Sequence, residues 1–208
     1  MHPNKAFRKT SPEQNLSFAQ DRGFGVLTVS GSDGPIASHV PFVISDDGTS
    51  FGAHLVRSNL ILPLLAEDQP ALMIVSGPDG YISPDWYGLE DQVPTWNYVA
   101  VHLYGTLRKL PDDRLRPHLE ALSEQFEKRL VPKPEWKLDK VTSEVLEKMQ
   151  RMIVPVEFSI ERVEGTWKLG QNKGSEAQAR AADNLENSEL GQMITELADL
   201  MRTEEIEL

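Results

Sequence analysis

One stretch of the chain reads Tyr81-Ile-Ser-Pro-Asp-Trp-Tyr87, and the segment Val93-Pro-Thr-Trp-Asn-Tyr-Val-Ala-Val-His-Leu-Tyr-Gly105 follows shortly after it. Together they hold two of the four tryptophans and all four tyrosines of the 208-residue chain, in one of its least charged parts. Aromatic rings that carry a polar group are costly to leave in water and need a hydrogen-bond partner when buried. Two interpretations of this aromatic stretch stay open: strands whose rings fill a core, or the wall of a pocket that holds a flat ligand.

The composition excludes several classes of protein. The chain contains no cysteine, so disulfides, zinc–thiolate sites, iron–sulfur clusters and thiol nucleophiles are excluded. No apolar run approaches the ~18 residues that a membrane-spanning helix needs, and the first residues lack the apolar region of a secretory signal. With a length that suits one domain or two small ones, these features predict a soluble cytoplasmic protein.

The net charge of −11 is unevenly distributed along the chain. From residue 174 to residue 208 there are nine acidic residues against two arginines, which is −7 of the total and leaves −4 for the remainder. Nucleic-acid binding draws on clustered lysines and arginines that neutralise phosphates. The chain shows no such cluster, so we do not expect it to bind DNA directly.

The order of predicted elements favours many short strands in the first half of the chain. A helix is expected from Ser11, with Pro12 at its first position, to about Asp21, and Gly23 ends it. The turn residues and apolar patterns predict strands at residues 24–30, 35–44, 50–55, 71–77, 79–83, 97–108 and 154–163, helices at 58–66, 114–130 and 142–153, an amphipathic tail helix at 188–201, and a polar loop at 167–173. This order predicts a mainly β, α+β protein: an antiparallel barrel or sandwich with peripheral helices.

Residues Arg57, Ser58 and Asn59 form the first candidate site. They follow a predicted strand and stand at the start of a predicted helix, where free backbone N–H groups favour an anion such as phosphate. The guanidinium of Arg57 would add a bidentate donor. The alternative is that Ser58 or Asn59 only caps the helix and that Arg57 pairs with a surface carboxylate.

The other polar groups give weaker signals. His39, His54 and His102 lie on predicted strands, but no carboxylate or His-x-x-x-His spacing accompanies them, so no metal site is expected. They would bond a ligand or be satisfied in the core. Gln171, Asn172 and Lys173 could reach a phosphate or a carbonyl-rich ring, or form a solvated loop. No nucleophile elbow or phosphate-binding loop motif is present, and the catalytic residues are unknown.

Taken together, these segments resemble the PaiB-type FMN-binding proteins, a family often described as FMN-binding negative transcriptional regulators. The resemblance covers about residues 1–185 in the family's order and spacing, and Gly170 stands where family members often carry serine. It is carried by Phe24-Gly25, Pro35-Ile-Ala-Ser-His-Val-Pro41, Gly52-Ala-His54, Arg57-Ser-Asn59, Tyr81-Ile-Ser-Pro-Asp-Trp-Tyr87, Val93-Pro-Thr-Trp-Asn-Tyr98, Val101-His-Leu-Tyr-Gly105 and Trp167-Lys-Leu-Gly-Gln-Asn-Lys173.

The resemblance implies an antiparallel split β-barrel of the pyridoxamine-phosphate-oxidase class, homodimeric, with FMN at the subunit interface. Arg57, Ser58 and Asn59 would bind the FMN phosphate, and His54 would lie near the ribityl chain or phosphate. The strand Ser38, His39, Val40, Pro41 would run beside the isoalloxazine ring. The partner subunit would supply Trp96, Asn97, Gln171, Asn172 and Lys173.

The resemblance also implies a domain division and a function. Residues 1–187 would form the FMN-binding domain, with a helical insertion at about 112–153, and residues 188–208 an acidic tail. The function expected is flavin-dependent redox chemistry or flavin sensing linked to transcriptional regulation, with enzymatic activity left open. The alternatives are a haem-binding split barrel that uses a histidine such as His39, or a regulator that acts through protein partners without catalysis.

Overall fold

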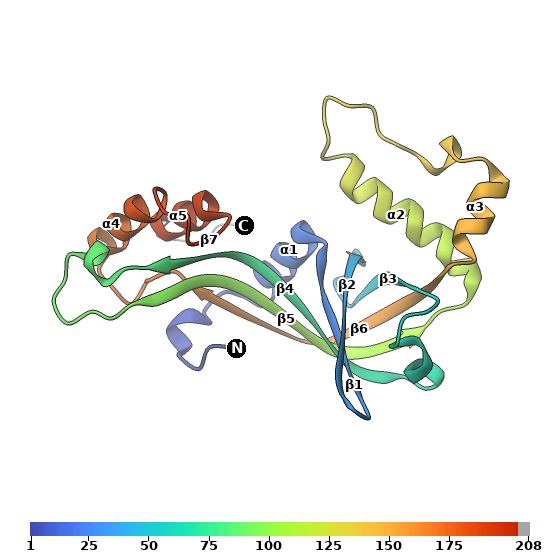
Figure 1. Cartoon of the computed structure of the whole chain (residues 1–208), viewed down its shortest axis with the longest axis horizontal. Helices are drawn as coiled ribbons and strands as arrows, with labels where there is room; N and C mark the ends of the chain where they lie inside the picture. Colours follow the sequence, from blue (N-terminus) through green and yellow to red (C-terminus); the bar gives the residue numbers. More distant parts are fainter. Residues whose placement is uncertain (204–208) are drawn as a thin grey trace. The chain divides into compact units, whose positions relative to one another are not determined.

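The computed structural model describes residues 1–203 and divides the chain into two compact units. Unit 1 comprises Met1–Ala19, Val75–His102 and Val163–Leu208, of which 204–208 lie outside the described residues, and unit 2 comprises Gln20–Ile74 and Leu103–Arg162. Three long strands, β4 (Gln69–Ile82), β5 (Thr95–Lys109) and β6 (Ile153–Lys168), carry residues of both units. Each unit is described below by itself (Figure 1).

Antiparallel strands dominate the described residues. The sheet order is β1-β2-β3-β6-β5-β4-β7, and an additional pairing joins β1 to β4, so the row of strands returns to its first member. The other strands are β1 (Phe24–Gly31), β2 (Gly34–Ile44), β3 (Ser50–Val56) and the short β7 (Gly191–Gln192). The expected mainly β chain with peripheral helices is therefore confirmed at this level.

Unit 2 is built from strands with one buried face. β1 pairs with β2 through Val26↔His39 and Leu27↔Ser38, and β2 pairs with β3 through Phe42↔Ala53. Alternating buried residues of these strands form the core, in which the Phe51 and Phe158 rings stack with centroids 4.6 Å apart. Such offset or stacked aromatic pairs add stabilisation beyond the apolar area that they bury.

Helices of unit 2 follow β5 in the chain. They are η4 (Asp112–Arg114), α2 (Leu115–Glu127), η5 (Leu138–Lys140) and α3 (Ser143–Gln150). The helices expected at 114–130 and 142–153 are confirmed as α2 and α3, with shorter bounds. Arg129 at the end of α2 forms an ion pair with Asp21 at 3.0 Å, and Gln125 donates to the carbonyl of Phe42.

Unit 1 has an aromatic and small-residue core. Helix α1 (Pro12–Arg22) begins as predicted: the Ser11 hydroxyl accepts from Gln14 N, and the Gln14 side chain accepts from Ser11 N, a reciprocal capping arrangement. The helix ends at Gly23, whose φ of +56° is accessible to glycine at little cost. Within unit 1, the buried Asn15 of this helix accepts a hydrogen bond of 2.8 Å from the indole of Trp167.

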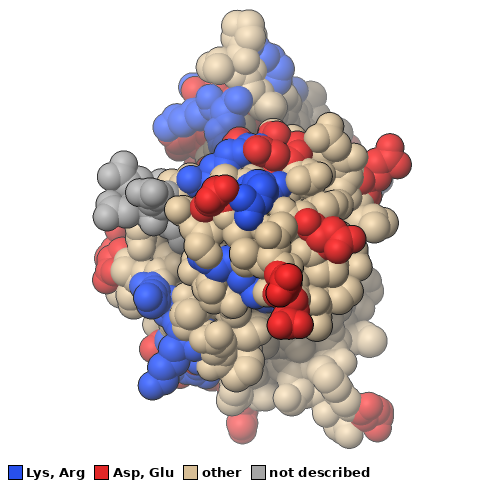
Figure 2. Space-filling model, turned by 90° about the vertical axis from the view of Figure 1, so that its left-hand side faces the viewer, with Lys and Arg blue, Asp and Glu red and all other residues tan. Residues whose placement is uncertain are grey.

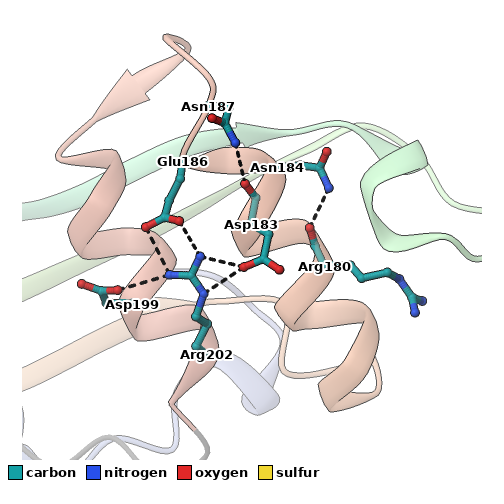
Figure 3. A network of polar contacts seen from close by, with 7 residues as sticks. All are labelled: Arg180, Asp183, Asn184, Glu186, Asn187, Asp199 and Arg202. Atoms are coloured by element: carbon teal, nitrogen blue, oxygen red, sulfur yellow. Dashed lines mark hydrogen bonds and ion pairs between the residues drawn. The ribbon is translucent and has the colours of Figure 1, made fainter.

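Two further helices of unit 1 pack against each other: α4 (Ser175–Leu185) and α5 (Ile194–Arg202). Figure 3 shows Arg202 of α5 reaching Asp183 and Glu186, with Asp199 as a third carboxylate; the Arg202–Asp183 and Arg202–Glu186 pairs measure 2.8 and 2.7 Å. The tail helix expected at 188–201 is thus confirmed with a later start, whereas α4 was not anticipated. The predicted domain boundary at residue 187 stays a prediction.

Three local expectations were wrong. The helix expected from residue 58 is a turn followed by the 3-10 helix η2 (Leu62–Ala66), whose early Pro63 lacks an N–H to extend a helix. Gly77 and Pro78 do not separate two strands but lie inside β4. Trp167 and Lys168 end strand β6, so the expected polar loop begins only at Leu169.

No helix of the described residues is long and apolar enough to cross a membrane. Two other 3-10 helices lie in the described part of the chain, η1 (Lys5–Phe7) and η3 (Pro84–Tyr87).

Candidate functional site

The candidate residues fall into two groups, one in each unit. Unit 2 carries Ser38, His39, Val40, Pro41, His54, Arg57, Ser58 and Asn59, and unit 1 carries Trp96, Asn97, Gln171, Asn172 and Lys173. We describe each group separately.

In unit 2, the turn after β3 reaches strand β2. Asn59 Nδ2 donates to Ser38 Oγ at 2.9 Å, although the two residues are 21 positions apart. Asn59 Oδ1 in turn accepts from the backbone N of Ile61 at 2.9 Å, so both ends of this amide hold the turn in place. The structure therefore joins two segments that the sequence had named independently.

Arg57 is exposed, and backbone carbonyl groups orient its guanidinium. Its Nε donates to the carbonyl of Arg151 at 2.8 Å, and its Nη2 lies 3.4 Å from the carbonyl of Ile153. Within residues 1–203 no carboxylate forms an ion pair with it, so the surface ion pair that we weighed for Arg57 is not observed. Carbonyl partners leave the positive charge available for an anion.

The structure has a turn at Ser58 and not the start of a helix, so the expected source of anion affinity at this position is different. A helix dipole cannot support phosphate binding here, since η2 begins only at Leu62 and is five residues long. The polar side chains themselves, and not free N–H groups of a helix, are the donors that this turn offers.

Residues 38–41 of β2, next to this turn, pair with a neighbouring strand on only one side. The β2–β3 register covers Phe42, Val43 and Ile44, whereas residues 38–41 pair with β1 on the other side. Backbone N–H and C=O groups beyond a register need other hydrogen-bond partners. Val40 is buried and His39 is exposed, with its ring centroid 6.2 Å from that of Phe24.

His54 faces helix α2 rather than open space. Its Nδ1 lies 3.0 Å from Nε2 of His118 on α2. Burial lowers the pKa of His54, and burial together with the nearby His54 lowers the pKa of His118 to about 4. No local sequence pattern indicates this pair, because the two histidines are 64 positions apart on different elements.

In unit 1, the candidate residues have different surroundings. Trp96 is half exposed and contacts the Tyr81 ring edge-on, with centroids 6.2 Å apart, whereas Asn97 is fully buried. Gln171 is engaged by its own chain: Oε1 accepts from Leu169 N at 2.8 Å and Nε2 donates to the Trp167 carbonyl at 2.6 Å. Gln171 therefore shapes the loop, and its amide is already occupied.

Three of these residues line one cavity within unit 1, of about 250 Å³. Asn97, Asn172 and Lys173 contribute to its wall. The remaining lining, for which the sequence had predicted no binding role, is Asn4, Phe7, Tyr87, Asp91, Gln92, Val93, Thr95, Lys168 and Gly170. Tyr87 therefore fits both interpretations of the aromatic stretch, because its ring is buried in the core and also lines the wall of a cavity.

Two ammonium groups face this cavity. Lys168 Nζ donates to Thr95 Oγ1, and Lys173 Nζ donates to Gln92 Oε1 and lies 5.5 Å from the centre of the Tyr87 ring. Burial lowers the pKa of Lys168. Burial raises the pKa of Tyr87, and its hydrogen bond with Asn97 opposes that rise.

Comparisons with known proteins identify the family of this chain and its cofactor. A family model described as "Putative FMN-binding domain" matches residues 1–162. A curated relative, "Protease synthase and sporulation protein PAI 2" of Bacillus subtilis, is 32% identical over 191 residues, covering 91% of each chain. This relative is the type that the sequence resemblance had named.

Solved structures show the same fold at low identity. The FAD and heme binding protein from Mycobacterium smegmatis is 19% identical with a TM-score of 0.58, covering 78% of this chain and 73% of that one. The flavocytochrome Anf3 from Azotobacter vinelandii is 13% identical with a TM-score of 0.53, covering 80% and 72%. The family description also confirms FMN as the expected cofactor, and the chain belongs to this FMN-binding family of PaiB-type proteins.

Proposed function

We propose that this chain binds FMN at the Ser38–Asn59 site and works as a flavin-dependent redox or flavin-sensing protein linked to transcriptional regulation. The observation that carries the proposal is the 2.9 Å hydrogen bond from Asn59 to Ser38. This bond joins two features. One is the turn that carries Arg57, which has no carboxylate partner among the described residues, and the other is the edge of β2, where backbone N–H and C=O groups are outside the β2–β3 register. The arginine can bind the phosphate of FMN, and the free backbone groups can hydrogen-bond to the polar edge of its isoalloxazine ring.

The residues present fit this cofactor. Arg57 would bind the phosphate with its guanidinium, Ser58 and Asn59 would line the same turn, and Ser38, His39, Val40 and Pro41 would run beside the ring. His54, held by His118, would lie near the ribityl chain or phosphate through its other nitrogen. FMN, when bound, supplies hydride and electron transfer, while the protein binds, orients and tunes it.

The proposed assembly is a homodimeric split β-barrel with FMN at the subunit interface. The return of the strand order to β1 supports the barrel. The half-exposed Trp96, next to a hollow of about 440 Å³ that Ser76, Gly77 and Tyr98 also line, supports a covered surface in unit 1. In the assembly, the partner subunit would supply Trp96, Asn97, Gln171, Asn172 and Lys173.

A regulatory role would be indirect and would depend on protein partners. On the face drawn in Figure 2, lysine and arginine side chains are interspersed with aspartate and glutamate and form no continuous basic stripe. Neutralising several phosphates along DNA requires such a stripe. A cytoplasmic location and the division into residues 1–187 and 188–208 belong to the same proposal.

The absorption spectrum of freshly purified protein tests the proposal first. A flavin spectrum, or a thermal shift on adding FMN to colourless protein, is the expected result, and the absence of both would overturn it. Oxidation of NADH or NADPH by the FMN-loaded protein would separate an oxidoreductase from a sensor. A DNA mobility shift would contradict the indirect role.

Arg57→Ala tests the site itself. Loss of a charge-assisted contact worth roughly 1.5–3 kcal/mol should weaken FMN binding about ten- to a hundred-fold. Riboflavin, which lacks the phosphate, should bind the variant as it binds the wild type. Arg116→Ala, which removes an exposed arginine of α2, is the matched control. Equal FMN affinity of Arg57→Ala and Arg116→Ala would show that the phosphate lies elsewhere.

The second candidate function is haem binding. The titles of two fold neighbours name a heme binding protein and a flavocytochrome, and the exposed His39 on β2 is the ligand that we would assign. A Soret band in purified protein, lost in His39→Ala, would favour this function over flavin binding.

A further inference from the structure

We propose that the cavity of unit 1 is a binding site for a small oxyanion, either a carboxylate or a phosphate group that also carries a hydrogen-bond donor. The site is defined by Lys168, Lys173, Tyr87 and Asn97. Its lining lies wholly within unit 1 and does not include Arg57, Ser58 or Asn59. The proposal depends on the proposed function in one respect: the FMN phosphate is one of the two possible sources of the anion.

The charges of the lining favour an anion. Lys168 and Lys173 bond to neutral partners, Thr95 and Gln92, and no carboxylate among residues 1–203 forms an ion pair with either lysine. Asp91 also lines the cavity, so two ammonium groups face one carboxylate. Each ammonium has three donors and uses one of them on the side chain named. Taking an ammonium partly out of water is costly unless an opposite charge compensates it.

A buried acceptor adds a second requirement. Asn97 is fully buried and lines the cavity, and its Oδ1 has no hydrogen-bond partner among the described residues. Buried carbonyl oxygens are almost always satisfied. A ligand with an O–H or N–H next to its anionic group would satisfy it; a hydroxy acid and a protonated phosphate both have this chemistry.

The Tyr87 hydroxyl lies next to Asn97. A Cβ added at Gly170 would lie 3.5 Å from Tyr87 Oη and 3.5 Å from Asn97 Nδ2, which places both polar groups around this glycine. The left-handed φ of +82° at Gly170 favours glycine, and serine at this position would be strained. Gly170 thus keeps the wall next to both polar groups free of a side chain.

The loop over the cavity is held in a fixed conformation. Gln171 bonds two backbone groups of its own loop, and Gln178 of α4 donates to the Leu169 carbonyl at 3.1 Å. Lysines on a constrained backbone lose less entropy when they bind than lysines on a mobile loop. These contacts indicate a preformed site.

The volume limits the ligand. At about 250 Å³ the cavity is below the ~300–1,000 Å³ typical of clefts that bury drug-sized ligands. It takes an anionic group or a very small acid, but not a whole flavin. The ligand is therefore either a small acid substrate or the phosphate end of FMN, and the second outcome would replace the assignment of that phosphate to Arg57.

Calorimetry with defined probes tests the proposal. Inorganic phosphate, glycolate and acetate are titrated into FMN-free and FMN-saturated protein, and into Lys173→Gln, Lys168→Gln and the control Lys109→Gln on the exposed end of β5. We expect phosphate and glycolate to bind more tightly than acetate, which lacks the donor for Asn97. Each cavity variant should bind phosphate about tenfold more weakly, because one charge-assisted contact is lost. Thermal unfolding confirms that the variants fold.

The outcomes separate the sources and the alternatives. Equal phosphate affinity with and without FMN identifies a small acid as the ligand. Phosphate binding that FMN abolishes, together with weaker FMN but unchanged riboflavin binding in Lys173→Gln, identifies the FMN phosphate. The proposal is wrong if none of the three anions binds FMN-free protein, or if both cavity variants bind phosphate as Lys109→Gln does. The flavin spectrum reports the proposed function independently of these titrations.

Discussion

Nδ1 of His54, on strand β3, lies 3.0 Å from Nε2 of His118, on helix α2, and this contact links the helix to the strands of unit 2. Only one of the two facing nitrogens can carry the hydrogen that they share, so the pair is compatible with two neutral rings and not with two imidazolium ions. Gly52 makes room for it, since a Cβ there would lie 3.0 Å from His118 Nδ1.

This pair predicts a loss of stability in mild acid. Both pKa values are lowered in the folded protein, that of His118 to about 4, so between pH 4 and pH 6.5 the unfolded chain binds more protons than the folded one. The contribution of this pair to the free energy of unfolding should fall as the pH drops below about 6.5, with a slope of up to about 1.4 kcal/mol per pH unit for each histidine. Urea unfolding at pH 7.5, 6 and 5 measures it. His118→Gln should flatten the slope and His39→Gln should not; equal slopes in all three proteins would contradict the prediction.

The Asn15–Trp167 contact predicts a large effect of a small truncation. Asn15 accepts from the indole and donates to the carbonyl of Ser11 at 2.9 Å, and both residues are buried. Asn15→Ala would leave the indole N–H unsatisfied and open a void, at a cost of roughly 2–4 kcal/mol. Chemical unfolding with Gln20→Ala, an exposed position of the same helix, as control checks this. A difference below about 0.5 kcal/mol between the two variants would contradict it.

The ion pairs of Arg202 should make a salt-dependent contribution to the stability of the protein. It pairs with three carboxylates on α4 and α5, but its side chain is 31% exposed, so the network should stabilise the protein by only about 1 kcal/mol. Arg202→Gln should lose that amount at low salt and much less in 1 M NaCl, because salt screens exposed charges. Arg116→Gln, which removes a single exposed pair with Glu120, should show about half the effect or less. An effect that is independent of salt would point to packing by the arginine stem instead.

Replacing Gly105 by alanine should cause a severe steric clash between two strands. A Cβ at this position in β5 would lie 1.8 Å from the carbonyl oxygen of Ser159 in β6, so the two strands must separate. Gly105→Ala should cost about 3 kcal/mol or more, at the upper end of overpacking defects. Gly174→Ala, where a Cβ would meet nothing within 4 Å, should be almost neutral. Similar melting temperatures of the two variants would show that the strands adjust easily.

Asn59 and Ser38 predict a coupling that a double-mutant cycle can measure. If their hydrogen bond positions the turn for FMN, then Asn59→Ala and Ser38→Ala should each weaken FMN binding several-fold, and the double variant no more than the worse single one. Flavin fluorescence titration provides the affinities. Fully additive losses would mean that each side chain acts separately.

The sequence predicted the elements whose pattern is local. The Ser11-Pro12 start and the Gly23 end of α1 are set by backbone chemistry within a few residues, and they are confirmed. Helix α4 was missed because three of its four buried residues are alanines (Ala177, Ala181 and Ala182, beside Leu185), which give a weak apolar signal next to charged neighbours. Strand β4 was predicted as two strands, 71–77 and 79–83, because only the structure shows that the chain continues extended through Gly77, where a Cβ would lie 2.6 Å from the Phe18 ring.

The candidate site was predictable in part. Ser38 and Asn59 were named from separate segments, but their contact depends on how β2 and β3 end, which no local pattern records. Gln92 was not named, because a glutamine in a loop has no distinctive spacing, and Lys168 was quoted only as part of the 167–173 segment, without a role of its own. The roles of all these residues toward FMN remain predictions for the experiments above.

Strands β4, β5 and β6 each contribute residues to both compact units, so the boundaries between the units fall inside strands at Ile74, His102 and Arg162. Recombination between homologous genes preserves folding where crossovers fall in exposed loops, and here no loop separates one unit from the other at these three positions. Exchanging one unit for its counterpart in a relative would therefore cut these strands, whereas a change in the loops between strands leaves them whole.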